Sequence, residues 1–127
     1  MRLNEISYND ASPIDGYGPG FFRVGGKVHH DALLLSGAGT SAWAGFEDVV
    51  QILSLAGQID VLLVGTGAEI SYIPADFRRP LEEVGIGVEV MSSASACRTY
   101  NILLSEGRRI AAALLPVDKA DQAADQI

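Results

Sequence analysis

The stretch that decides the fold is MSSASACRTYNILLSEGRRIAAALL, which runs from Met91 to Leu115. Apolar residues recur at helical spacing over residues 96–104, and Gly107 then supplies the positive φ with which many helices end. The run from Ile110 to Leu115 contains no polar residue, as is typical of a strand covered on both faces. The stretch therefore predicts a helix that feeds a buried central strand.

The predicted helix carries different residue types on its two sides. A rotation of about 100° per residue places Cys97 and Tyr100 on the apolar arc. Arg98, Asn101 and Ser105 lie on the opposite arc. We therefore expect Cys97 to be a small buried residue and not a nucleophile, and Tyr100 to be structural and not a proton donor. Three roles stay open for Arg98 and Asn101: a ligand rim, a partner contact and a structural link to neighbouring loops.

A β-hairpin is predicted near the N-terminus. The pair Gly25-Gly26 can take positive φ at both residues, and it separates two short strand-like runs, Phe21 to Val24 and Lys27 to His30. The following segment, residues 37–45, is predicted as a loop because of its glycine content, with Trp43 buried against the sheet. The hairpin is expected to form an extra layer beside the main sheet.

The remaining pattern is typical of an α/β domain. Helices are predicted over residues 46–56 and 74–84, and Pro80 is expected to bend or restart the second helix. Strands that alternate with helices imply parallel pairing with right-handed crossovers. The predicted fold class is α/β, three-layer, with a central mostly parallel four-stranded sheet, helices and the N-terminal β-hairpin layer. The four strands begin at Ala32, Ile59, Ile86 and Ile110.

Length and charge limit what the chain does. Its 127 residues are the size of one domain, which we place at residues 1–117, followed by a polar acidic tail at 118–127. A formal charge of −7 repels phosphate backbones and anionic lipids, which argues against nucleic-acid and membrane-surface binding. No apolar run approaches the roughly 20 residues that span a bilayer. The lone cysteine and the lack of a signal peptide's apolar segment favour a bacterial cytoplasmic location.

Four motifs occur in order along the chain: YGPGxFxVxG from Tyr17, DVLLVGTG at 60–67, GIGVEVM at 85–91 and AxACRTYNxLLxEGRRxAAALLP at 94–116. In combination they resemble the MTH-type family of small α/β domains, whose relatives include a mitochondrial assembly factor of respiratory complex I and an adipogenesis-associated domain protein. The resemblance implies the same three-layer fold. It also implies a role in assembly or interaction, with a protein partner such as a component of a respiratory complex.

The candidate ligand or partner surface combines strand-end and helix residues. Gly65-Thr66-Gly67 follows a predicted central strand, and in open α/β sheets ligands collect beyond the carboxyl ends of strands, where loops expose N–H groups. Arg98, Asn101 and Arg108 complete the candidate set. From the family motif, Arg108 is expected to fix the helix-to-strand turn or to contact a partner. Ion pairs are expected among Glu106, Arg108 and Arg109, or between these arginines and acidic residues such as Glu82, Glu83 and Glu89.

No motif indicates catalysis, a metal or a cofactor. His29 and His30 are adjacent on a predicted strand and point to opposite faces, and the sequence offers no third ligand. The segment Gly65-Thr66-Gly67 lacks the third glycine of a dinucleotide fingerprint, and no phosphate-loop motif occurs. We therefore predict no catalytic residues, no metal ligands and no cofactor, and favour a binding protein over an enzyme.

Three hypotheses follow for the function. The first is a non-catalytic protein-interaction domain that acts as an assembly factor for a respiratory membrane complex. The second is a small-molecule or anion-binding protein, or an enzyme, with its site near Gly65-Thr66-Gly67 and Arg98. The third is a homo-oligomer in which exposed hairpin edges pair between subunits.

Overall fold

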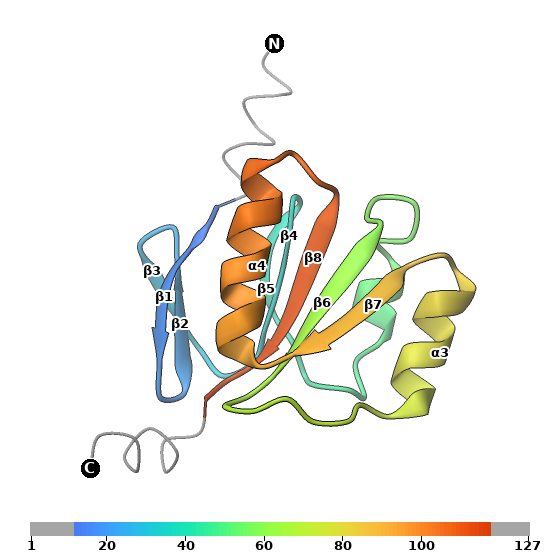
Figure 1. Cartoon of the computed structure of the whole chain (residues 1–127), viewed down its shortest axis with the longest axis horizontal. Coiled ribbons are helices and arrows are strands. Elements are labelled where there is room, and N and C mark those ends of the chain that lie inside the picture. Colours follow the sequence, from blue (N-terminus) through green and yellow to red (C-terminus); the bar gives the residue numbers. More distant parts are fainter. Residues whose placement is uncertain (1–11, 118–127) are drawn as a thin grey trace.

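The computed structural model describes residues 12–117 and contains two β-sheets. The smaller sheet is antiparallel, with the strand order β1-β2-β3 (Figure 1). Its strands are β1 (Ile14–Gly18), β2 (Phe21–Val24) and β3 (Lys27–His30). The predicted hairpin around Gly25-Gly26 is therefore confirmed, and φ is positive at both glycines. The strand β1 is not predicted by the sequence pattern, and it adds a third strand to the hairpin.

The larger sheet is mixed and has five strands in the order β5-β4-β8-β6-β7. The central pair β6 and β8 is parallel, as is the pair β6 and β7. The pairs β4·β5 and β4·β8 are antiparallel. The bounds are β4 (Leu33–Ser36), β5 (Gly39–Ala42), β6 (Val61–Thr66), β7 (Gly87–Met91) and β8 (Ile110–Leu115).

This sheet corrects the prediction of four mostly parallel strands. Residues 37–45 were predicted as a loop, but Gly37 and Ala38 form a tight turn and the next four residues return as β5. The strand β5 is short, polar and half exposed, so its sequence lacks the apolar pattern of a buried strand. The strand β4 pairs with β8 in the antiparallel direction, and the paired residues Leu33 and Leu114 are 81 positions apart in the chain. No local sequence signal fixes that direction.

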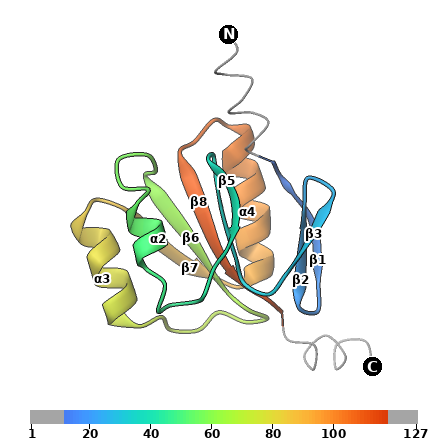
Figure 2. The ribbon, with the colours of Figure 1, turned by 180° about the vertical axis from the view of Figure 1, so that it is seen from behind.

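Helices cover both faces of the five-stranded sheet. On one face lies α4 (Ser93–Ser105), beside the three-stranded sheet. On the other face lie α2 (Val50–Leu53) and α3 (Ala75–Glu83), as Figure 2 shows from behind. The side chains of β8 alternate between these two cores: Ala112 and Leu114 belong to the α4 side, and Ala111 and Ala113 to the other. Both faces of β8 are buried, as its apolar run predicts.

The helix α2 is shorter than the predicted helix over residues 46–56. Side-chain hydrogen bonds hold the preceding segment as a turn: the Trp43 indole N–H donates to the Asp48 carbonyl over 3.0 Å, and the Gln51 amide donates to the Asp48 carboxylate over 2.9 Å. Trp43 itself is buried, as expected, and packs against the rings of Phe46 and Phe77. Residues 46–49, which the apolar periodicity predicts as the start of a helix, therefore belong to this turn.

The helix α3 runs through Pro80 as one nine-residue helix. Proline at this position removes a single hydrogen bond to the first turn, because its missing N–H would have bonded to the carbonyl four residues earlier. The burial of Phe77 and Leu81 against the sheet holds the helix together on both sides of the proline. The helix therefore does not stop and restart at Pro80.

Two expectations concern parts of the chain beyond these elements. The predicted acidic tail at residues 118–127 lies outside the described residues, so the proposed domain boundary stays a prediction. Among the helices of residues 12–117, none combines the length and the apolar character that crossing a membrane requires.

Candidate functional site

The structure divides the candidate surface into two groups at opposite ends of the large sheet. In the parallel pair β6·β8, Thr66 lies opposite Leu115 at one end, and Val61 lies opposite Ile110 at the other. Gly65, Thr66 and Gly67 therefore lie at the carboxyl end of β6. The two ends of the six-residue strand β8 are about 17 Å apart. Arg108 lies just before the amino end of β8, and so at the opposite end of the sheet from Gly65, Thr66 and Gly67. The six candidate residues do not form one rim.

Gly65 and Gly67 hold the first turn of α4 against the sheet. A Cβ at Gly65 would lie 2.8 Å from Ser93 Cα, which only a glycine avoids. The Gly67 N–H donates to Ser93 Oγ over 2.9 Å, and the Ser93 N–H donates to the Gly67 carbonyl over 2.8 Å. The Ser93 hydroxyl also donates to the Leu115 carbonyl. The Gly67 amide is therefore engaged inside the protein, which favours a structural role over an anion-binding rim.

The sequence offers Ser93 and Ser95 as candidate caps for the start of α4, but the structure gives Ser93 a different role. It is completely buried, and its hydroxyl joins β6, β8 and α4. Ser92 is the actual helix cap, since its side chain accepts from the Ser95 N–H. Serine is common at helix starts, so the sequence alone does not distinguish Ser93, which bonds to the sheet, from the neighbouring serine that caps the helix.

Thr66 orders the loop between β6 and α3. Its hydroxyl donates to the Glu69 carbonyl over 2.7 Å and accepts from the Ser71 N–H over 3.0 Å. The loop displays two large apolar side chains: Ile70 is 64% exposed and Tyr72 is fully exposed. A pocket of about 480 Å³ lies beside them. It is lined by Ile70, Ser71, Tyr72, Ile73, Arg78 and Val90, and we call these residues the loop surface.

Arg98 and Asn101 have different environments on α4. Arg98 is exposed, and its guanidinium donates to Ser95 Oγ over 3.3 Å. Asn101 is half-buried, and its carboxamide forms two hydrogen bonds of 2.8 Å with the backbone of Ile14. Three roles were left open for Asn101, and these hydrogen bonds show the third, a structural link to a neighbouring segment. Asn101 also borders a pocket described below.

Cys97 and Tyr100 are both in the core. Their exposed fractions are 4% and 1%. Burial raises the pKa of the Cys97 thiol to about 11, although the nearby Arg98 charge acts in the opposite direction. Burial also raises the pKa of the Tyr100 phenol to about 12. Both groups are therefore neutral at physiological pH, as the predicted structural roles require.

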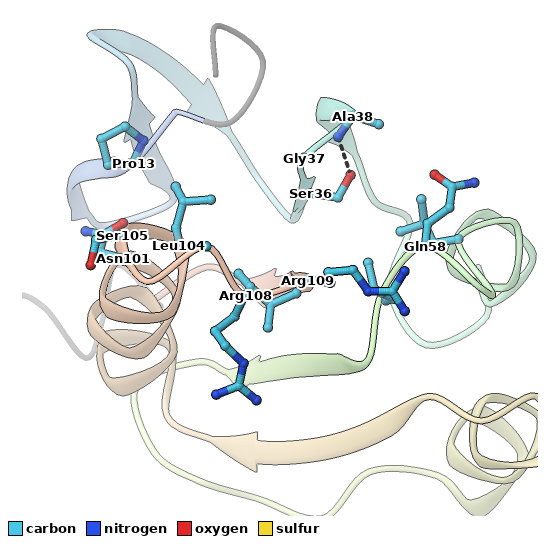
Figure 3. A pocket seen from close by; sticks show the side chains of 14 residues that line it. Pro13, Ser36, Gly37, Ala38, Gln58, Asn101, Leu104, Ser105, Arg108 and Arg109 are labelled. Atoms are coloured by element: carbon cyan, nitrogen blue, oxygen red, sulfur yellow. Dashed lines mark hydrogen bonds between the residues drawn. The ribbon is translucent and has the colours of Figure 1, made fainter. Parts of the chain in front are cut away.

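A larger pocket, of about 600 Å³, lies where α4 ends and β8 begins (Figure 3). We call it the helix-end pocket. It brings Asn101 and Arg108 together with segments that the sequence analysis did not connect, namely the β4–β5 turn and the loop before β6. Its lining residues are Pro13, Ser36, Gly37, Ala38, Leu55, Gln58, Ile59, Asn101, Leu104, Ser105, Gly107, Arg108, Arg109 and Ile110.

The two arginines of this pocket, Arg108 and Arg109, differ in their partners. Arg109 forms an ion pair with Asp60, with 2.8 Å between Nη2 and Oδ1, and it also donates to the Gly57 carbonyl over 3.0 Å. This pairing lowers the pKa of Asp60 and raises that of Arg109. The predicted partners Glu82, Glu83, Glu89 and Glu106 are therefore wrong for Arg109. Within residues 12–117, no hydrogen bond or ion pair engages the Arg108 guanidinium.

The histidines on β3 show no ligand cluster. His29 lies opposite Phe22 and His30 opposite Phe21 in the β2·β3 pairing, so the two side chains leave opposite faces of the small sheet. In the part of the chain that the structure describes, no group of three His, Cys, Asp or Glu side chains is placed to hold a metal ion.

The architecture is that of a Mth938-like domain. The chain superposes on the solution structure of such a domain from Bordetella pertussis with a TM-score of 0.70, at 28% sequence identity, over 90% of this chain and 92% of that one. The family model described as a protein of unknown function (DUF498/DUF598) matches residues 14–115, and the chain belongs to this family. The resemblance seen in the four sequence motifs is thereby confirmed.

Two relatives bear on the role of the chain. An uncharacterized protein of Rhodobacter capsulatus is 50% identical over 120 residues, which cover 94% of this chain and 97% of that protein. The protein from Danio rerio named NADH dehydrogenase [ubiquinone] 1 alpha subcomplex assembly factor 3 is 36% identical over 110 residues. That alignment covers 81% of this chain but 63% of the relative, which is less than two thirds of its length.

Proposed function

We propose that this chain is a non-catalytic protein-binding domain that assists the assembly of a respiratory membrane complex. The observation that carries the proposal is its similarity to the assembly factor of Danio rerio over most of the chain. The core chemistry agrees with a binding role, because the thiol and the phenol of α4 are buried and neutral. The partner would be a component of that complex or one of its assembly intermediates.

The loop surface is the part of the molecule that best fits a protein partner. Tyr72 and Ile70 are large side chains that a free monomer leaves in water, and tyrosine is enriched among the few residues that carry most of the binding energy of an interface. Thr66 fixes the loop through two hydrogen bonds, so less conformational entropy is lost when a partner binds. In this proposal, Gly65, Thr66 and Gly67 support the partner surface from below and do not touch a ligand themselves.

One of the two edges of the five-stranded sheet lies next to this surface. The strand β7 is an edge strand, and the Val88 carbonyl on its outer side accepts from Arg78 Nη2 over 3.2 Å. Arg78 also pairs with Glu82 over 3.0 Å and lines the pocket. An arginine that covers an edge carbonyl blocks uncontrolled strand pairing while leaving the apolar pocket open.

The proposal is tested by co-purification and by complementation. Cells that lack the gene are supplied with a tagged wild-type chain or with the double variant Ile70→Ser/Tyr72→Ser. We expect the wild type to retain subunits of the respiratory complex and to restore the amount of assembled complex on native gels. The double variant should weaken partner affinity by more than about tenfold, as the loss of an aromatic anchor does.

The matched control is Ile102→Ser. Ile102 is 57% exposed on α4, on the other face of the sheet, so its replacement removes an exposed apolar side chain without touching the loop surface. If deletion of the gene leaves the complex fully assembled and no subunit co-purifies, the proposal is wrong. Light scattering of the purified chain separates a homo-oligomer from the predicted heterocomplex, and cell fractionation checks the expected cytoplasmic location.

A further inference from the structure

The helix-end pocket is a second candidate site, remote from the loop surface and independent of the proposed function. Its volume of about 600 Å³ lies in the range of small-molecule sites, which is about 300 to 1,000 Å³. It opens between the last turn of α4, the β4–β5 turn and the loop before β6, so three segments far apart in sequence enclose it (Figure 3).

The walls of the pocket are largely apolar. Ile59 and Ile110 are 5% and 3% exposed and belong to the two cores, so they form a rigid base. Leu55 and Leu104 are half-buried and line the pocket from opposite faces of the sheet. Such walls favour a ligand with an apolar body, because contact with them removes hydrocarbon surface from water.

The charge of the lining is opposite to the charge of the chain. The chain has 16 Asp and Glu against 9 Lys and Arg, yet the lining contains Arg108 and Arg109 and not one carboxylate among the described residues. Arg109 is already paired with Asp60. Arg108 is exposed, and Figure 3 shows its guanidinium turned away from Ser36. All five of its N–H donors remain available to an anion once the side chain rotates toward the rim.

A buried hydroxyl adds a second donor. Ser36 is 7% exposed and lines the pocket, and its Oγ accepts from the Ala38 N–H over 3.1 Å. Within residues 12–117 no acceptor is found for the hydroxyl proton of Ser36. Arg108 and Ser36 thus both offer hydrogen-bond donors, which suits a ligand group that accepts.

We propose that the helix-end pocket binds a small organic carboxylate with an apolar body. Its carboxylate accepts from the Ser36 hydroxyl and from the Arg108 guanidinium, once that exposed side chain rotates toward the pocket from the position in Figure 3. Its hydrocarbon part lies against Leu55, Leu104 and the isoleucine base. A carboxylate suits an arginine fork because two parallel N–H···O bonds form at once. A neutral or cationic head group would lose this interaction.

The test is a titration of the full chain with octanoate, followed by the amide signals in ¹H–¹⁵N NMR spectra. We expect saturable shifts at Gly37, Ala38 and Gly107, and none at Gly67. Octanol and octylamine, which have the same hydrocarbon chain, should bind at least about tenfold more weakly, since each lacks the charge-assisted bonds.

Two variants decide the role of the guanidinium. Arg108→Gln should weaken octanoate binding by about tenfold or more, whereas Arg108→Lys, which keeps the cation, should retain part of the affinity. Arg98→Gln is the matched control, because Arg98 is an exposed arginine on α4 that does not line the pocket. Absence of octanoate shifts, equal binding of octylamine, or an Arg108→Gln variant with unchanged affinity would each overturn the proposal.

Discussion

Asn101 and Ile14 are joined by two reciprocal hydrogen bonds across 87 positions of sequence. The Asn101 side-chain oxygen accepts from the Ile14 N–H, and its amide nitrogen donates to the Ile14 carbonyl, each over 2.8 Å. The pairing resembles one more rung of a β-ladder, supplied by a side chain. It fastens the small sheet to α4 at the point where β1 begins.

Replacing Asn101 by alanine should loosen this attachment. Two half-buried backbone groups of Ile14 would lose their partners, which we expect to lower the free energy of unfolding by about 2 kcal/mol. Urea denaturation gives the change, and hydrogen exchange should become faster in the small sheet than elsewhere. Ser105→Ala, one turn further along α4 on the surface, should change stability by less than about 0.5 kcal/mol. Equal stability of both variants would show that the two hydrogen bonds are not important for stability.

Gly65→Ala should strain the contact between β6 and α4. The added methyl group would lie 2.8 Å from Ser93 Cα and 3.0 Å from Leu114 Cδ2, and the first of these is a backbone atom that cannot rotate away. We expect a loss of about 1 to 3 kcal/mol, as for other overpacked cores. Gly37→Ala is the control, because no atom lies within 4 Å of its new methyl group. Thermal unfolding that places both variants at the same midpoint would contradict the predicted clash.

The stability of the protein should fall at alkaline pH. The ordinary pKa of a cysteine, 9.0, rises to about 11 at Cys97, and that of a tyrosine, 10.0, rises to about 12 at Tyr100. The folded chain therefore binds more protons than the unfolded chain above pH 9, so the unfolding free energy decreases as pH rises from about 9 to 12. Below pH 9 this contribution is constant. Denaturation curves of Cys97→Ala and Tyr100→Phe should each show a shallower decrease than the wild type.

The Cys97 thiol should react slowly in the native protein. A pKa near 11 leaves about a hundredfold less thiolate at pH 8 than a pKa of 9.0, and the side chain is 4% exposed. We expect an aromatic disulfide reagent to label the folded chain at least about a hundredfold more slowly than the chain in urea. The absorbance of the released thiolate measures the rate. Rapid labelling without denaturant would reopen a catalytic role for this residue.

Local patterns were sufficient for several parts of the fold. The Gly25-Gly26 turn fixes the β2–β3 hairpin, because both the positive φ and the strand register follow from adjacent residues. The strand β8 follows from an apolar run long enough to need cover on both faces. Helical periodicity also placed Tyr100 inward and Arg98 outward on α4.

Features that depend on distant contacts were not predictable in this way. The strand β5 forms because its backbone finds β4 and not because of its side chains, which are small and half exposed. The amide of Gly67 was expected to face a ligand, but a serine 26 positions later in the chain accepts its hydrogen bond. The helix-end pocket requires the β4–β5 turn to meet Arg108, and neither segment alone has the pattern of a binding site.

The place of β8 between β4 and β6 has a consequence for biosynthesis. The β4–β5 hairpin and the β6–β7 pair both precede β8 in the chain, and no direct pairing joins these two pieces. While Ile110 to Leu115 are still inside the ribosome, the emerged chain therefore has two separate parts of the sheet. The edges of β4 and β6 that will later pair with β8 are unpaired. The final assembly of the sheet must wait for that segment, and until then the unpaired edges are exposed to chaperones and to neighbouring chains.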